Sequence, residues 1–227
     1  VTNDSSVRLG IGELRVAIVS PQPSILTHLR ERYCHFLLTG GIPDFEIEMR
    51  PLQDPEPAAR FLDVPVEWLT ELIHESDLPV PQADRKDSGK RSGFFRADGA
   101  SSHKTKLDSK PEVRRIGGRV AFRRVDFAGS MDLAADCGRV VFANRMQIIA
   151  VESFLRIAYS FLAVEHGGLL LHSAAVARGP HGYIFPGPSE TGKSTIASLA
   201  TGQEQILSDE MVLVRKIKGA YRVYSSP

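Results

Sequence analysis

The sequence predicts an α/β protein with an α+β tendency, built on a mixed sheet in which an antiparallel strand enters a glycine-bounded loop. Two observations predict this class. Short stretches of alternating apolar and polar residues are separated by stretches with helical spacing. The apolar segment 169–177 is followed by the five-residue turn "RGPHG" and then by "YIFPG". So short a turn joins antiparallel strands, because a parallel crossover needs a dozen or more residues.

Residues 1–83 are predicted to form a small N-terminal α/β region that contains a β-α-β unit. Apolar residues alternate in "GELRVAIVS" and in "DFEIEMR", which predicts two half-buried strands. The intervening "PSILTHLRERYCHFLLTGG" has one apolar helical face, and we expect this helix to end at Gly40 and Gly41. A second helix is expected at 65–75, introduced by Asp63.

Residues 84–118 are predicted to be a basic flexible linker or insertion. From Asp84 to Arg119, 11 basic residues outnumber 5 acidic ones, and glycine and serine are scattered without apolar periodicity. One alternative is a docking segment for an acidic peptide or nucleic acid, anchored by Phe94 and Phe95. Basic low-complexity runs are usually only solvated, so the sequence argues against a nucleic-acid partner.

Composition and targeting signals argue against a membrane protein. The longest apolar-rich stretch, 146–164, contains Glu152 and Arg156, so it predicts a buried helix and no membrane partner. The N-terminus has no basic-then-apolar signal region, and the two cysteines, Cys34 and Cys137, have no paired histidines for zinc. We therefore expect a cytoplasmic protein.

The second half of the chain is predicted to begin with strands. Strands are expected in "RVAFRRVDF" and "GRVVFA", with a meander between them, and a helix is expected over 146–165. The helix leads into "GLLLHSAAVAR", which is apolar on both faces and is therefore expected at the centre of its sheet. His172 interrupts this apolar run.

The loop at 187–195, "GPSETGKST", fits the phosphate-loop spacing G-x-x-x-x-G-K-[ST]. In this pattern backbone N–H groups surround phosphate oxygens, the lysine reaches the outer phosphates and the hydroxyl holds Mg²⁺. The helix that the loop opens adds positive potential. We expect ATP to contact Gly187, Pro188, Ser189, Glu190, Thr191, Gly192, Lys193, Ser194 and Thr195.

An acidic pair, Asp209 and Glu210, stands between two apolar segments after this loop. Carboxylates at a strand end facing a phosphate loop can hold magnesium or accept a proton from an attacking hydroxyl. The alternative is a polar turn before a strand, but the loop favours a site. Ser194, Asp209 and Glu210 are therefore the expected metal ligands.

The order "LLLHSAAVARGPHGYIFPGPSETGKSTIASLA" and then "ILSDEMVLV" resembles the HPr kinase/phosphorylase family and its kinase relatives, whose nucleotide-binding core is shared with phosphoenolpyruvate carboxykinases. The resemblance covers about residues 168–215. It implies that residues 119–227 form a P-loop kinase-like domain, incomplete at its C-terminus. It also implies catalytic roles for His172, Lys193 and Asp209.

The function expected from this resemblance is transfer of the γ-phosphate of ATP to a hydroxyl, with serine favoured, on a protein, peptide or small molecule. ATP and Mg²⁺ would be the cofactors, Asp209 the general base and Lys193 a charge stabiliser. The alternative is a non-catalytic ATP-binding regulatory module. The resemblance also implies a homo-oligomer. Glu190 and Glu210 depart from the family, which usually has glycine and aspartate there.

Overall fold

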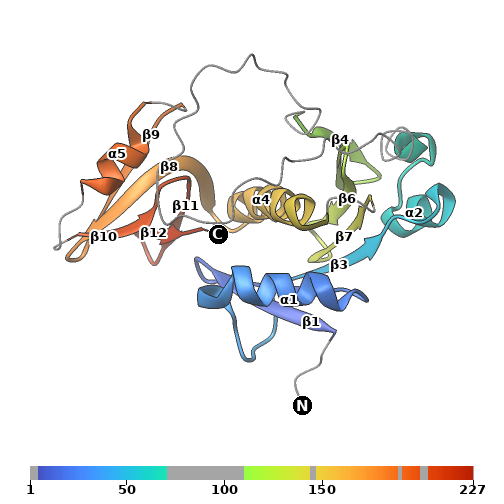
Figure 1. Cartoon of the computed structure of the whole chain (residues 1–227), viewed down its shortest axis with the longest axis horizontal. Coiled ribbons are helices and arrows are strands. Elements are labelled where there is room, and N and C mark those ends of the chain that lie inside the picture. The colour runs from blue at the N-terminus through green and yellow to red at the C-terminus, as the bar shows by residue number, and fades with distance from the viewer. Residues whose placement is uncertain (1–4, 71–109, 144–146, 189–190, 200–203, 227) are drawn as a thin grey trace, which may run out of the picture.

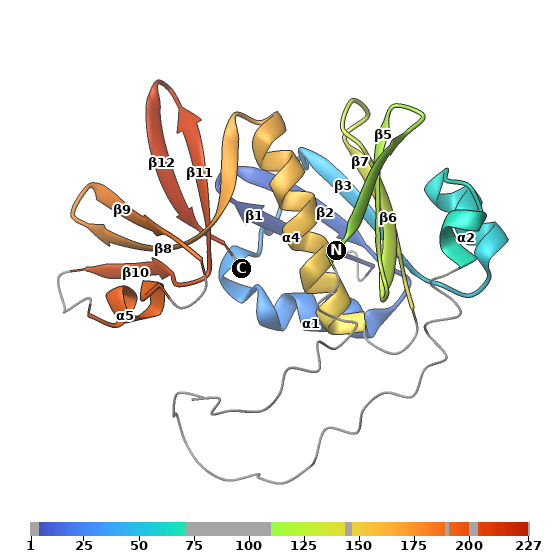
Figure 2. The same cartoon turned by 90° about the horizontal axis from the view of Figure 1, so that it is seen from above.

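The structure is a computed structural model, and it describes residues 5–70, 110–143, 147–188, 191–199 and 204–226. Within these residues the strands form two sheets, one of seven strands and one of five, with a long helix between them (Figures 1 and 2). The fold is therefore mixed α/β, as the sequence predicts.

The seven-stranded sheet is built from β1 (Ser6–Ile11), β2 (Leu14–Val19), β3 (Phe45–Pro51), β4 (Glu112–Ile116), β5 (Arg119–Arg124), β6 (Phe127–Asp132) and β7 (Cys137–Phe142). Its order is β1-β2-β3-β7-β6-β5-β4. The helices around it are α1 (Pro23–Arg32), the short 3₁₀ turn η1 (Cys34–Phe36), α2 (Pro55–Leu62) and α4 (Gln147–Glu165). The predicted β-α-β unit is confirmed, because β2 and β3 pair in parallel on either side of α1 in the chain. The predicted meander is confirmed by antiparallel β5, β6 and β7.

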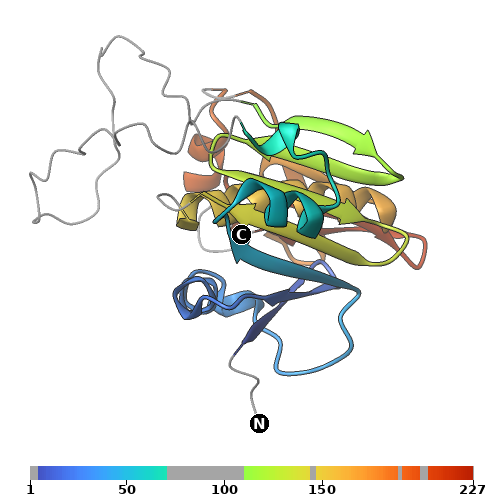
Figure 3. The ribbon, with the colours of Figure 1, turned by 90° about the vertical axis from the view of Figure 1, so that its right-hand side faces the viewer.

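Each face of the seven-stranded sheet has its own apolar cluster. On β7, Val140 and Phe142 join the cluster under α1 and α4, whereas Val141 joins the cluster under α2, as strand alternation requires. Figure 3 looks onto the second face, with α2 in front of the sheet. Phe154 of α4 is fully buried, and its ring centroid lies 5.5 Å from that of Phe122 on β5. One face of the predicted long helix is thus buried in the core, whereas Ile148, Ile149 and Val164 are exposed. In the described part of the chain, no helix combines the length and apolarity that crossing a membrane takes.

The helix that we expected to run to Gly40 is shorter. α1 ends at Arg32, and the chain then passes through η1. The reason lies in the edge strand β1, which the sequence analysis did not identify: the Leu38 N–H donates to the Arg8 carbonyl oxygen at 2.9 Å, and Leu37 forms a β-bridge with Leu9. Pairing with an open strand edge replaces continued helix.

A second correction concerns Asp63, which we expected to introduce a helix. It instead ends α2, a helix that the sequence analysis missed, and has the left-handed φ of 57° that is common for the residue that closes a helix. Helical residues resume at 67–70, and the rest of the expected helix lies outside the described residues.

The expected linker and domain boundary also need revision. Residues 112–116, which we placed in the linker, form β4 and pair with β5, because β5 would otherwise be an open edge. Residues 71–109 lie outside the described part of the chain. β3 pairs in parallel with β7, so this sheet joins the expected N-terminal region to the first strands of the expected C-terminal domain.

The five-stranded sheet is built from β8 (Gly168–Arg178), β9 (His181–Pro186), β10 (Gln205–Ser208), β11 (Met211–Ile217) and β12 (Ala220–Ser225). The expected β8–β9 hairpin and the central place of β8 are confirmed. We expected a mixed sheet here, but all its pairings are antiparallel. The reason is that β9 and β10 run in the same direction on opposite edges of β8, so they never become neighbours.

The two sheets meet where the β1–β2 turn packs on β11 and β12. Gly12 at the tip of this turn has φ +58°, and an added Cβ would collide with the Leu213 side chain. The Arg215 Nη1 donates to the Gly12 carbonyl oxygen at 2.5 Å, and the Tyr224 hydroxyl donates to the Glu13 carboxylate at 3.0 Å. Only glycine combines this backbone conformation with this close approach.

Candidate functional site

The strand register brings three separate segments to the middle of β8. His172 pairs with Met211, the first residue of β11, and Ser173 pairs with Pro186, the last residue of β9. The Ser173 N–H also donates to the Glu210 carbonyl oxygen at 3.0 Å. The loop after β9 and the acidic residues before β11 therefore begin on opposite edges of β8, next to His172.

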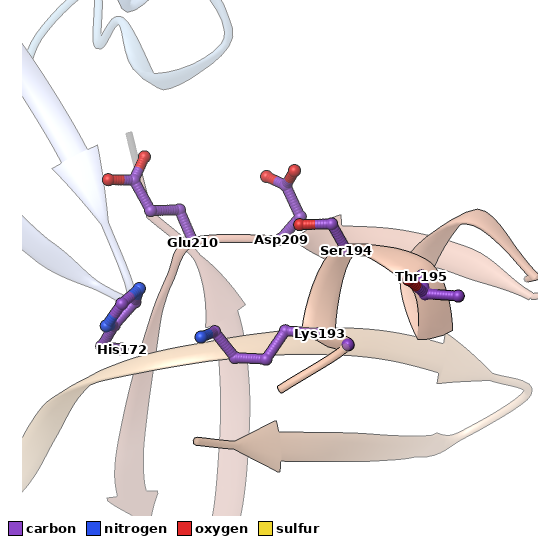
Figure 4. Close-up of a pocket in the computed structure, with 7 residues that line it drawn as sticks. His172, Lys193, Ser194, Thr195, Asp209 and Glu210 are labelled. Carbon is purple, nitrogen blue, oxygen red and sulfur yellow. The ribbon is translucent and has the colours of Figure 1, made fainter. Parts of the chain in front are cut away.

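These segments surround a cavity of about 470 Å³ (Figure 4), within the 300–1,000 Å³ range of small-molecule sites. It is lined by His172, Gly192, Lys193, Ser194, Thr195, Asp209 and Glu210. Three other expected contact residues, Gly187, Pro188 and Thr191, belong to the loop but do not line this cavity. Ser189 and Glu190 lie outside the described residues.

Lys193 begins α5 (Lys193–Ser198) and is buried. Its ammonium donates to the carbonyl oxygens of Gly187 at 2.8 Å and Pro188 at 2.6 Å. A buried ammonium needs such partners, because an unpaired charge away from water is costly. A phosphate ligand would therefore have to displace the Gly187 and Pro188 carbonyl oxygens from the Lys193 ammonium.

Two glycines shape the loop. An added Cβ at Gly187 would lie 2.6 Å from the Thr191 hydroxyl oxygen, which donates to the Pro188 carbonyl oxygen at 2.8 Å. Gly192 has φ +88°, and the space around its missing side chain is open. The glycine positions of the motif thus have a structural reason in this chain.

Asp209 and Glu210 occupy a break between β10 and β11. The Ser208 hydroxyl oxygen accepts hydrogen bonds from the N–H groups of Glu210 at 3.3 Å and Met211 at 3.1 Å. The Glu210 carboxylate accepts two hydrogen bonds from Arg156 of α4. Among the described residues, the exposed Asp209 carboxylate has no hydrogen-bond or ion-pair partner. The two neighbouring acids therefore have different environments.

His172 is exposed at the cavity rather than buried in the sheet. Figure 4 shows its ring at the end of the cavity toward which the Lys193 ammonium points. In the described part of the chain its imidazole has no hydrogen-bond partner, so His172 is not a core histidine held by hydrogen bonds.

The oxygen-bearing side chains of the cavity fit magnesium with a phosphate ligand better than a structural metal. Among the described residues, no three histidine, cysteine or acidic side chains are grouped so that they could hold a metal ion. Magnesium commonly takes only one or two carboxylates and completes its shell with water and phosphate oxygens. Ser194 and Asp209 line the same cavity and could supply such a partial set.

Neither a scan against models of protein families nor a search of curated proteins finds a match for this chain.

The sequence did not reveal the role of Arg156, which does not line the cavity but binds Glu210, which does. Arg156 appeared only as one of the charges that argue against a membrane span, although it follows Glu152 at the i,i+4 spacing. Two charges on one face of an otherwise apolar helix are a usable signal, because that face must reach either solvent or a partner.

Proposed function

We propose that the protein is an ATP-dependent kinase with an HPr kinase-like P-loop, which phosphorylates a hydroxyl, with serine favoured, on a protein, peptide or small molecule. One observation supports this most: a single cavity is lined by Lys193 and Ser194 of the loop, by Asp209, and by His172. A phosphate-binding lysine and a free carboxylate in one cavity are the groups that phosphoryl transfer needs.

Each side chain has a proposed role. Lys193 neutralises charge on the transferring phosphoryl group after leaving the carbonyls of Gly187 and Pro188. Asp209 accepts the proton of the attacking hydroxyl as transfer proceeds. His172, which lines the same cavity, would tune this proton transfer. Ser194 and Asp209 would hold Mg²⁺, which supplies charge neutralisation and orientation of the phosphates when bound.

Asp209→Asn tests the kinase proposal. The purified protein, with Mg²⁺ and γ-labelled ATP, is incubated with candidate hydroxyl acceptors, and label transfer and ATP hydrolysis are both measured. We expect Asp209→Asn to lower transfer by about 100-fold or more, since general bases typically contribute 10²–10⁴-fold. Asp136→Asn, in the distant β6–β7 turn, is the matched control. Transfer that survives Asp209→Asn would exclude this residue as the base.

Lys193→Ala tests the nucleotide site itself. We expect ATP affinity, measured by calorimetry, to fall by about 10-fold or more, because a charge-assisted hydrogen bond to phosphate is lost. Lys216→Ala, on the exposed face of β11, is the matched control. Circular dichroism should be unchanged in both. Equal ATP affinity in the two variants would argue against phosphate binding by the loop at 187–195. ATP binding without any phosphate transfer would favour the non-catalytic regulatory module.

A further inference from the structure

The Glu210 side chain is fully engaged by Arg156. Nη1 of Arg156 donates to Oε1 of Glu210 at 2.9 Å, and Nη2 donates to Oε2 at 3.2 Å. This is the two-pronged arrangement that a planar guanidinium makes with a carboxylate, and it fixes the orientation of both groups. Both Glu210 oxygens therefore have a cationic partner other than a metal.

The helix that carries Arg156, α4, is packed against the core. The neighbours of Arg156 in α4, Leu155 and Tyr159, are buried, and Phe154 lies in the aromatic cluster of the seven-stranded sheet. α4 also packs against β8 and β11, between the two sheets (Figure 2). The guanidinium thus links the core of one sheet to the acidic break in the other.

The backbone at this break is fixed from both sides. The Glu210 carbonyl oxygen accepts from Ser173 N–H, and the Glu210 N–H donates to the Ser208 hydroxyl. Within the described part of the chain, Arg156 is the side chain that anchors the Glu210 carboxylate. Glu210 directly follows Asp209, whose own carboxylate has no partner among the described residues. The direction in which Asp209 points is therefore set by its neighbour.

The Arg156–Glu210 ion pair is expected to contribute little to the stability of the fold. Both side chains are substantially exposed, and exposed ion pairs contribute little to folding. The larger effect of the pair is geometric, because it orients Glu210 next to Asp209 at the cavity.

We infer that Arg156 is a positioning residue: it keeps Glu210 out of the metal shell and holds the 209–210 break so that Asp209 alone serves the proposed magnesium and base roles. This inference rests on the proposed function for the roles of Asp209. The placement of the break by Arg156 does not depend on it.

The first test compares Arg156→Gln, Glu210→Gln and the double variant by calorimetry of ATP with and without Mg²⁺. Because the two single variants remove the same contact, both should weaken the Mg²⁺-dependent part of binding by a similar factor, about 10-fold for a lost supporting contact. The double variant should be no worse than either single one. The exchanged pair Arg156→Glu with Glu210→Arg should recover part of the loss.

Glu210 acting as a metal ligand would give a different pattern. Glu210→Gln would then weaken Mg²⁺-dependent binding, whereas Arg156→Gln would release the carboxylate and leave that binding equal or stronger. Opposite effects of the two variants would overturn the inference. Arg222→Gln on β12, which removes a similarly exposed ion pair with Glu13 of the β1–β2 turn, should leave ATP binding unchanged.

The second test does not involve nucleotide. Hydrogen exchange of a peptide covering 205–212 should become faster in Arg156→Gln and Glu210→Gln, but not in Arg222→Gln, because the break loses its anchor. Unchanged exchange in the first two would overturn the positioning role. If the wild-type protein binds no ATP, the proposed function fails, and the exchange result still decides whether Arg156 places the break.

Discussion

The seven-stranded sheet and the five-stranded sheet differ in how far each buries its apolar side chains. In the first, Leu9, Ile18 and Ile47 of the neighbouring strands β1 to β3 are all 0% exposed. In the second, Leu169 of β8 is 55% exposed and Ile206 of β10 is 50% exposed. Burial of apolar side chains is therefore more complete in the first sheet, although Val212 and Leu213 of β11 are also 0% exposed. The candidate site lies on the sheet with the weaker core, where side chains keep access to ligand.

The comparison predicts that truncating an apolar side chain lowers the free energy of unfolding by different amounts in the two regions. Phe154→Ala should lower the free energy of unfolding by about 3–5 kcal/mol, as expected for a fully buried aromatic residue. Leu169→Ala should change it by only about 0.5 kcal/mol or less, since its side chain is largely exposed. Urea unfolding monitored by circular dichroism measures both. Similar costs for the two variants would break the distinction between the sheets.

The contact between the two sheets should be weakened by a substitution at Gly12. Gly12→Ala should destabilise the protein by at least about 1–2 kcal/mol, because a Cβ is unfavourable in left-handed backbone, and the collision with Leu213 adds to this cost. Gly117→Ala is the matched control, because Gly117 has φ +55° and no neighbouring atom within 4 Å of an added Cβ. Thermal unfolding should show a larger loss for Gly12→Ala. Equal losses would mean that the contact with β11 adds nothing.

The smallest effect is expected at Asp44, beside the seven-stranded sheet. A side-chain hydrogen bond from Arg15 lowers the pKa of this carboxyl. Because the folded pKa lies below the unfolded one, the contribution to stability is present above about pH 4 and is lost as the pH falls through the folded pKa. Asp44→Asn should therefore be slightly less stable than wild type at pH 7 and equally stable in acid. A difference that persists at low pH would point to packing rather than charge.

Features set by local sequence were predictable. The five-residue turn predicted the β8–β9 hairpin, and alternating apolar residues predicted β2 and β3, because both signals act between near neighbours. The parallel pairing of β3 with β7 was not predictable, since it joins strands from distant parts of the chain. The same holds at the site. The loop at 187–195 was found from its spacing, but the contact between Arg156 and Glu210 depends on where α4 lies against β8.

The break between β10 and β11 has a consequence for how two adjacent acids can share one cavity. Neighbouring residues of a regular strand project to opposite faces, so an uninterrupted strand would send Asp209 and Glu210 in opposite directions. The strand register shifts just before the pair, and Figure 4 shows both carboxylates on the same side. An interruption in the ladder thus gives the protein a two-carboxylate edge that a regular strand cannot form.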